Sequence, residues 1–387
     1  MQLCNLNIIG DGKEHLRNIQ VTNGKITAVS ESEKCQKNST GETTINFENA
    51  IAFPGLINSH DHLDFTLFPK TGNRIYNNYT EWGKDIHDQN KETISAVLKI
   101  PQYTRIQWGL YKNLLNGITT VVNHGGKLPV NSNFINVIQN NHCLHSVQFE
   151  NNWKLKLNRV LIKDQPFVIH VGEGTDDAAH REINTLIQWN LFKRKIIGVH
   201  GVAMDEKQAT AFEALVWCPV SNYFLLDSTA AIDKLKTKTS ILFGTDSTLT
   251  SGWNLWDHIR LARNTQLVSD KELFDMLTIT PAGVWGLKGL GKIAEQHTAD
   301  IVIAKKNKSL NNFDSFFSLN PEDILLILHN GEIKMFDSIL SDKIKGTDCE
   351  VKNFSKIFIG ESYKYVEGNL PEFTGQPPFI HNQEQTA

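Results

Sequence analysis

The sequence predicts an α/β fold: a distorted TIM-type (β/α) barrel with a small β-sandwich built from both ends of the chain. Between about residues 52 and 287, short apolar runs alternate with amphipathic stretches. Runs that are apolar on both faces are typical of parallel strands covered by helices. Both ends of the chain show instead the alternating pattern and the Asn-Gly turns of β-hairpins, and each is too short to form an independent sheet.

These patterns divide the chain into parts. Residues 1–51 and 288–352 are expected to pair as a composite β-sandwich domain, with hairpin turns at Asn23-Gly24 and Asn330-Gly331. Residues 52–287 are expected to form the barrel, and residues 353–387 a C-terminal tail, because they hold Pro and Gly but little periodicity.

The barrel region holds seven strand-like runs, which are AFPGLIN, GITTVVNH, HSVQFE, PFVIHV, IIGVHGV, ALVWCPVS and SILFGTD. Seven or eight β–α units in this length favour a TIM-type barrel. A nucleotide-binding sheet is disfavoured because neither GxGxxG nor GxxxxGK[ST] follows the first strand. Spacing makes HSVQFE the third strand, and residues 151–169 are too few for a complete helix–strand–helix passage. One β–α unit is therefore expected to be missing or degenerate.

Composition limits the function classes. With 39 Lys and Arg against 42 Asp and Glu, the net charge of −3 provides no basic field for nucleic acid. The 5 cysteines are widely spaced without CxxC, which disfavours a disulfide framework. We see no signal peptide and no apolar stretch of membrane-spanning length, so we expect a cytoplasmic protein with neither a membrane nor a nucleic acid as partner. The 14 His are the unusual feature.

Four of these histidines lie where strands are expected to end. His60 and His62 follow the first apolar run as an HxH pair, and residues at i and i+2 of a strand point to the same side. His170 and His200 close two later runs, Glu173 follows His170, and Asp246 closes another run. Because barrel active sites form at the carboxyl ends of the strands, these side chains should converge. Such a nitrogen and oxygen set suits one Zn²⁺, or alternatively Fe²⁺, with an open position for water.

The sequence resembles the amidohydrolase superfamily. Within it, it is most similar to the mononuclear-metal branch of cytosine, guanine and S-adenosylhomocysteine deaminases and triazine chlorohydrolases. The resemblance rests on motifs in order along the chain, which are NGKITAVS, FPGLINSHDHLD, GITTVVNHGG, HVGEG, GVHGVAMDEKQA, WCPVSNYFLL, LFGTDSTLTSG, TITPAGVWGL and LGKIAEQHTADIVIAKK. It implies the same barrel with a β-sandwich from both chain ends.

The resemblance also implies roles for individual residues. His60, His62, His170 and Asp246 would be the metal ligands. Glu173 would carry a proton to a ring nitrogen of the substrate, and His200 would contact the attacking water or a substrate oxygen. Asp246 would also take the proton of the water that the metal activates.

Other residues near these motifs leave alternatives open. Glu150, which ends the run HSVQFE, is a candidate bridge to a second metal. Trp82 and His87, in the loop after the first strand, are candidate substrate contacts. His124 either lines the pocket or makes a structural hydrogen bond.

The function expected from this resemblance is metal-dependent hydrolysis of C–N bonds other than peptide bonds, in a small-molecule substrate. Deamination of a small purine-, pyrimidine- or triazine-like heterocycle is the first hypothesis. Hydrolysis of an amide, a carbamate or a carbon–halogen bond by the same site is the alternative, and a non-catalytic metal-binding barrel is a third. Homo-oligomerisation is left open.

Overall fold

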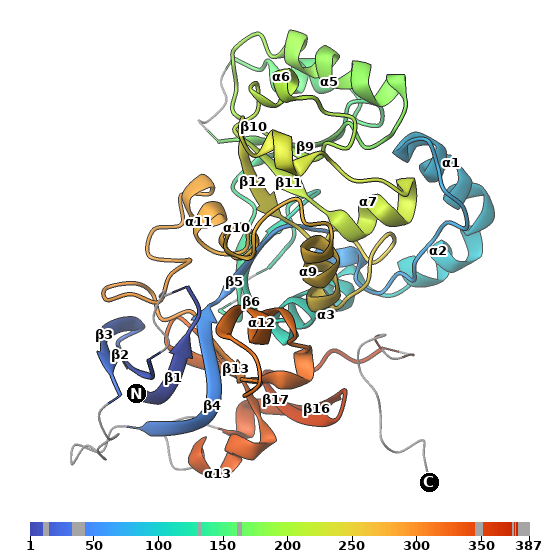
Figure 1. Cartoon of the computed structure of the whole chain (residues 1–387). Coiled ribbons are helices and arrows are strands. Elements are labelled where there is room, and N and C mark those ends of the chain that lie inside the picture. The colour runs from blue at the N-terminus through green and yellow to red at the C-terminus, as the bar shows by residue number, and fades with distance from the viewer. Residues whose placement is uncertain are drawn as a thin grey trace.

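The computed structural model describes residues 1–10, 15–32, 43–130, 133–160, 165–344, 351–373, 375 and 377. Within these residues the named strands form three sheets, of nine, five and three strands. In Figure 1 the nine-stranded sheet lies in the lower half of the view, and the five-stranded sheet with its helices lies in the upper half. A search of the described residues finds no helix with the length and apolar character needed to cross a membrane.

Strands from both ends of the chain share the nine-stranded sheet. The N-terminal strands are β1 (Gln2–Ile8), β2 (Arg17–Thr22), β3 (Lys25–Glu31) and β4 (Thr44–Pro54). β4 pairs in antiparallel register with β13 (Ile301–Lys305), and the sheet continues through β14 (Ile324–His329) and β15 (Glu332–Asp337). The ends of the chain therefore form one continuous sheet, while its organisation as a sandwich stays a prediction.

Both Asn-Gly turns in this sheet are where the sequence predicts them. Asn23 and Gly24 connect β2 to β3 with φ of 49° and 75°, and Asn330 and Gly331 connect β14 to β15 with φ of 52° and 78°. Positive φ at both central residues gives a turn whose twist matches that of the flanking strands, and Asn and Gly tolerate this conformation best. These turns set the register of the two hairpins.

The structure differs from the predicted C-terminal tail at residues 354–367. β16 (Phe354–Ile359) and β17 (Ser362–Glu367) form an antiparallel hairpin, and β17 pairs with β15 at the edge of the large sheet. The hairpin buries Ile357, Ile359 and Val366. An alternation of apolar and polar residues on either side of Gly360 is the signal of a hairpin, and the prediction overlooked it.

The middle of the chain has the predicted α/β character with parallel strands. A three-stranded sheet contains β5 (Leu56–Asp61), β6 (Ile118–Asn123) and β7 (Asn136–Ile138). A five-stranded sheet contains β8 (His142–Ser146), β9 (Phe167–Val171), β10 (Ile196–His200), β11 (Ala214–Trp217) and β12 (Ser240–Phe243). Nearly all residues of β5, β6, β9, β10 and β11 are buried, as expected for strands covered on both faces.

Helices cover these sheets and fill the connections between the strands. They are α1 (Tyr79–Gln89), α2 (Lys91–Leu98), α3 (Gln102–Leu115), α4 (Trp153–Leu157), α5 (Asp177–Trp189), α6 (Glu206–Ala209), α7 (Pro219–Leu226), α8 (Ile232–Leu235), α9 (Leu255–Asn264), α10 (Asp270–Asp275), α11 (Ile279–Val284), α12 (Asn312–Phe317) and α13 (Ser341–Ile344). Asp176 caps α5 by accepting a hydrogen bond from the backbone N–H of Ala179.

The two parallel sheets meet at β5 and β12 without a strand ladder among the described residues. The backbone N–H groups of Thr245 and Asp246, just after β12, donate to the carbonyl of His60 in β5 at 3.1 and 3.0 Å. The carbonyls of Met276 and Leu277 accept from Phe243 of β12 and from Ile57 of β5. These hydrogen bonds bring the ends of β5 and β12 together, but a closed barrel is not confirmed.

The parallel strands are interrupted between β7 and β8. Residues 139–141 alone separate these strands, and β7 runs parallel to β6 while β8 runs parallel to β9. β7 belongs to the three-stranded sheet and β8 to the five-stranded sheet, so the chain passes from one sheet to the other here. The expected missing or degenerate unit at residues 151–169 stays a prediction. The predicted run HSVQFE is too long, because β8 ends at Ser146 and Glu150 lies in the following turn.

Candidate active site

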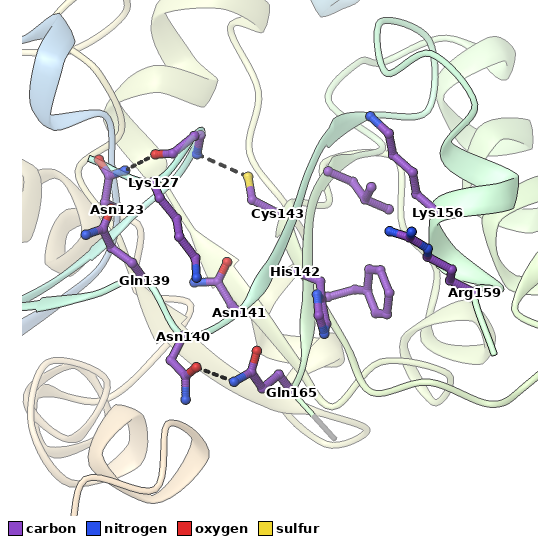
Figure 2. Close-up of a pocket in the computed structure, with 14 residues that line it drawn as sticks. Asn123, Lys127, Gln139, Asn140, Asn141, His142, Cys143, Lys156, Arg159 and Gln165 are labelled. Carbon is purple, nitrogen blue, oxygen red and sulfur yellow. Dashed lines mark hydrogen bonds between the residues drawn. The ribbon is translucent and has the colours of Figure 1, made fainter. Parts of the chain in front are cut away.

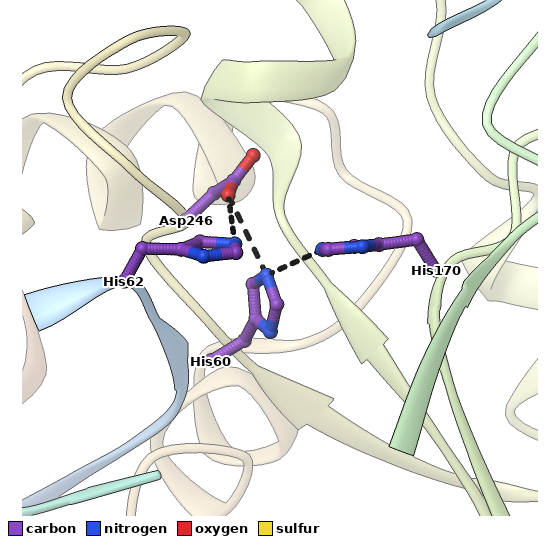
Figure 3. Close-up of side chains that lie close together, drawn as sticks. All are labelled: His60, His62, His170 and Asp246. Carbon is purple, nitrogen blue, oxygen red and sulfur yellow. Dashed lines mark hydrogen bonds and ion pairs between the residues drawn. The ribbon is translucent and has the colours of Figure 1, made fainter. Parts of the chain in front are cut away.

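Four predicted ligands come together where the strands end (Figure 3). His60 lies in β5, His62 follows β5, His170 lies in β9 and Asp246 follows β12. One ligand atom from each lies within 4.8 Å of every other. Asp246 Oδ1 is 3.4 Å from His60 Nε2 and 3.5 Å from His62 Nε2. All four side chains are largely buried.

His170 presents an unprotonated nitrogen to the cluster. The Nδ1 of His170 is 2.8 Å from the carbonyl of His145, a hydrogen bond that requires Nδ1 to carry the proton. The Nε2 of His170 therefore has a free lone pair, and it lies 3.1 Å from the Nε2 of His60. Burial and the neighbouring histidines hold the pKa of His170 well below its usual value and lower that of His62 to about 3. Neutral imidazoles and one carboxylate converging in a buried site fit a divalent metal such as Zn²⁺.

Asp246 is held as a carboxylate by its surroundings. Its Oδ2 accepts hydrogen bonds from the hydroxyls of Ser221 at 2.6 Å and Thr250 at 3.0 Å. Burial alone raises the pKa of Asp246, but the hydrogen bond with His60 and the nearby His200 and His62 outweigh burial and keep it well below its usual value. Its φ of 59° is a left-handed conformation that is rare outside glycine, and such conformations are concentrated at functional sites.

Glu173 and His200 form a second group that shares Asp246 with the first. His200 Nε2 lies 3.5 Å from Glu173 Oε2 and 4.0 Å from Asp246 Oδ2. The amide of Asn222 lies 2.9 Å from His200 Nδ1, and an amide N–H donated there would place the ring proton on Nε2. Burial, then the charges of Asp246 and Glu182, raise the pKa of Glu173 well above its usual value. A carboxyl of this kind can hold a proton near neutral pH and transfer it.

His124 lies directly against the cluster. Its ring centroid is 4.2 Å from that of His170 and 5.0 Å from that of His60. It is buried, and neither ring nitrogen has a hydrogen-bond partner. Of the two alternatives, the structural hydrogen bond is therefore not observed, and His124 lines the site.

A buried ion pair supports the strand end that carries the HxH pair. Asp61, between His60 and His62, accepts a hydrogen bond from Lys112 Nζ at 2.8 Å and from Asn113 Nδ2 at 2.7 Å, both on α3. Asn58 Nδ2 reaches Thr245 Oγ1 at 2.8 Å, which ties β5 to the segment after β12. These hydrogen bonds thus connect β5 to α3 and to the segment that carries Asp246.

An apolar cavity of about 710 Å³ opens beside the cluster. Trp82 and His87, the predicted substrate contacts, both line it from α1. Phe65 and His145 connect the cavity to the ligands, because the Phe65 ring stacks on His62 at 5.2 Å and the His145 ring lies 5.3 Å from His170. The sequence analysis did not identify His145 as a site residue. The bounds of the strand that carries it, β8, could not be placed from the sequence.

Glu150, the candidate bridge to a second metal, belongs to neither group. One carboxylate oxygen is paired with Lys156 Nζ, and the other accepts from the backbone N–H of His145 at 2.9 Å. Its position in the turn after β8, rather than at the strand end, directs the carboxylate to these partners.

A second cavity, of about 620 Å³, lies beside the break between β7 and β8 (Figure 2). Its lining includes Lys127, Lys156 and Arg159, with amide side chains such as Asn140 and Gln165, which bond to each other. None of the predicted catalytic or metal-ligating residues lines this cavity. It shares no lining residue with the cavity that Trp82 and His87 line.

Helix α1 is fastened to the segment that carries Glu173. The backbone N–H of Tyr79 donates to the carbonyl of Glu173 at 3.0 Å, and the Tyr79 hydroxyl donates to Glu182 Oε2 at 3.1 Å. The other oxygen of Glu182 accepts from the backbone N–H of Gly172 at 2.7 Å. Asn78, which caps α1, also donates to Asp176 at 2.6 Å. The sequence indicated neither Tyr79 nor Glu182, because neither belongs to a motif.

Comparison with known proteins finds a family match over part of the chain. Residues 156–334 match the model of the amidohydrolase family. The chain is 23% identical to a 5-methylthioadenosine/S-adenosylhomocysteine deaminase of Caldicellulosiruptor saccharolyticus over 88% of this chain and 93% of that protein. The resemblance to the amidohydrolase superfamily is confirmed. These matches also indicate the predicted class of enzyme, a hydrolase that acts on C–N bonds.

Solved structures share the fold of this chain. A zinc-bound adenosine deaminase from Xanthomonas campestris has a TM-score of 0.67 at 15% identity, covering 86% of this chain and 92% of its own. A zinc-bound atrazine chlorohydrolase from Arthrobacter aurescens has a TM-score of 0.66 at 16% identity, covering 86% of this chain and 94% of its own. At these identities the likeness concerns the fold alone.

Proposed function

We propose that this chain is a zinc-dependent deaminase of a small nitrogen heterocycle. The observation that carries the proposal is the adjacency of the two groups: the ligand cluster and the Glu173–His200 pair share Asp246, and Phe65 of the neighbouring apolar cavity stacks on His62. A site that only stored a metal would have no need of a buried carboxyl with a raised pKa beside its ligands.

His60, His62, His170 and Asp246 would hold the metal, and three imidazoles with one carboxylate favour Zn²⁺, with Fe²⁺ as the alternative. When bound, the metal would supply a water that ionises near neutral pH. Asp246 Oδ2 would accept a proton from the attacking water, since its low pKa keeps it ionised beforehand.

Glu173 would donate its proton to a ring nitrogen of the substrate, which makes the neighbouring carbon more electrophilic. His200, with its proton on Nε2, would donate a hydrogen bond to the oxygen that adds to that carbon. Glu173, now ionised, would take the proton of the hydroxyl that has added to the carbon and pass it to the amino group, so that the C–N bond breaks, ammonia leaves and a C=O bond forms. The proton held by Asp246 would exchange through solvent and restore the acid form of Glu173. Trp82 and His87 would contact the substrate from α1.

The test combines ammonia release with metal content. Zinc-loaded protein should release ammonia from at least one member of a panel of aminopurines, aminopyrimidines and aminotriazines. Glu173→Gln should lower kcat by about 10²- to 10⁴-fold with metal content unchanged, since general acid–base groups contribute that much. Glu213→Gln, at an exposed position, is the matched control and should leave kcat unchanged.

Product analysis separates the alternatives. Chloride release from a chlorotriazine, or a carboxylate product from a cyclic amide, in the absence of ammonia would replace deamination with the other hydrolytic reactions. Fully metal-loaded protein that hydrolyses no compound of any of these classes would contradict the enzymatic proposal and support the non-catalytic barrel.

A further inference from the structure

The cavity beside the cluster is apolar along most of its wall. Aromatic and aliphatic side chains come from four separate segments, and they include Phe65, Phe68, Trp82, Leu98, Phe149 and Leu249. The only residues in the lining with full charges are Lys84 and Asp88, and both are exposed on α1. Arginine, the residue best suited to binding a carboxylate or phosphate, is absent from the lining.

This wall begins at the reacting centre. Phe65 lies at the ligand cluster, where its ring stacks on His62, and it also packs edge-to-face on Phe68 at 5.4 Å. Beyond Phe68, the wall continues through Trp82 and Ile94, which pack in one cluster with it. A group attached to a ring bound at the cluster would therefore extend along apolar side chains.

Apolar walls accept apolar groups and reject charges. Burying apolar surface is favourable in proportion to its area, whereas a charged group loses its hydration and finds no buried partner here. Lys84 and Asp88 could pair with a charged group only at the exposed rim, where such pairs contribute little.

We propose that the site takes an uncharged, planar nitrogen heterocycle that bears an apolar substituent, and that it selects against the same ring bearing a charged substituent. The inference rests on the proposed function in one respect, which is that the ring of the substrate binds at the ligand cluster. The 710 Å³ of the cavity are ample for a substituent of several heavy atoms.

The name of the curated relative provides a matched pair of probes, 5-methylthioadenosine and S-adenosylhomocysteine. The two share the adenine, the ribose and the thioether, and they differ in a methyl group against a charged amino-acid chain. A second pair would be an aminotriazine with either an isopropyl or a carboxymethyl group at one position. We expect kcat/KM to favour the apolar member of at least one pair by at least about 10-fold. A tenfold ratio corresponds to about 1.4 kcal/mol.

A pair of variants tests whether the wall causes this selection. Leu98→Arg puts a cation on the wall at a half-exposed position, where the larger side chain can be accommodated. It should lower the preference for the apolar member by at least about fivefold. Leu155→Arg makes the same change on α4, outside the cavity, and should leave the preference unchanged.

Binding to Glu173→Gln, measured by calorimetry, separates this inference from the proposed deamination. If the charged member is turned over as well as the apolar one, the inference is wrong and deamination stands. If no probe is turned over but the apolar members bind more tightly, deamination fails and the inference stands. If neither apolar member binds better than its charged partner, or if Leu98→Arg and Leu155→Arg behave alike, the inference is overturned.

Discussion

The strand ends and helix α1 form two sides of one site, and they are built differently. On the strand side, His60, His170 and Asp246 are buried, polar and bonded to one another or to the backbone. On the helix side, Trp82 and His87 line the cavity from α1, together with apolar Ile86 and the exposed charges of Lys84 and Asp88. We infer that the two sides have different roles. Residues at the strand ends carry the proposed metal-binding and proton-transfer groups, and side chains of α1 determine which substrate binds.

The two sides are joined at one place. Tyr79, at the start of α1, bonds to the carbonyl of Glu173 through its backbone and to Glu182 through its side chain. The substrate wall and the proposed proton donor therefore cannot move independently. Substitution of Asp246 on the strand side should abolish catalysis. Substitution of Lys112, which pairs with Asp61, should destabilise the fold. Substitution of Tyr79, which connects α1 to Glu173, should lower kcat by a smaller factor.

The largest effect is expected at the carboxylate that both groups share. Asp246→Asn removes the only carboxylate among the four ligands and the proposed acceptor of the proton from water. We expect zinc bound per chain to fall to a small fraction, and kcat to fall by about 10³-fold or more. Metal analysis after dialysis and a deamination assay would check both. An Asn variant that kept full zinc content would show that Asp246 is not a ligand.

The next largest effect is expected below the strand end. Lys112→Met leaves Asp61 as a buried carboxylate without its cation. Removing one partner of a buried ion pair destabilises a protein by about 3–5 kcal/mol. Lys271→Met, which removes an exposed pair with Asp275, should change the free energy of unfolding by at most about 0.5 kcal/mol. Equal midpoints of urea unfolding for the two variants would contradict the structural role of Lys112.

A smaller effect is expected at the junction. Tyr79→Phe keeps the ring and removes the hydroxyl that donates to Glu182 and accepts from the backbone N–H of Gln148. Losing one such hydrogen bond corresponds to about 0.5–1.5 kcal/mol, so kcat should fall by about 3- to 10-fold with zinc content unchanged. Tyr103→Phe, at a position that is 62% exposed, is the control. If both variants had wild-type kcat, α1 would not position Glu173.

The last prediction concerns the pH dependence of stability. Burial raises the pKa of Glu182 to about 7, although bonds from Gly172 and Tyr79 oppose the shift. A carboxyl with a raised pKa in the folded state stabilises the fold below about pH 4.5, and this stabilisation is lost as pH rises towards 7. The loss should be at most about 3 kcal/mol. Glu182→Gln should have a flatter profile of Tm between pH 4.5 and 7.5, and an unchanged profile would contradict this shift.

The chemistry was predictable from the sequence because strand ends leave a local signal. An apolar run that stops at His170, His200 or Asp246 places the side chain at the edge of a parallel sheet, whatever the details of the fold. The Asn-Gly turns were predictable for a similar reason, since two adjacent residues decide the turn type.

The remaining features depend on contacts between distant segments. Residues 139–141 look like an ordinary polar connection, and only the pairing of β7 with β6 and of β8 with β9 reveals that the chain changes sheet there. The roles of Tyr79 and Glu182 depend on a hydrogen bond across 103 positions of sequence. Glu150 was assigned to a strand end because the apolar run continues past Ser146, where the strand stops.

The central claim is that one metal, held by the ends of β5, β9 and the segment after β12, drives the reaction. Anomalous X-ray diffraction at the zinc edge, from crystals of zinc-loaded protein, tests it most directly. We predict one zinc ion per chain, ligated by His60, His62, His170 and Asp246, with Glu150 still paired with Lys156. A second zinc ion bridged by Glu150, or a zinc ion bound away from these four residues, would contradict the account.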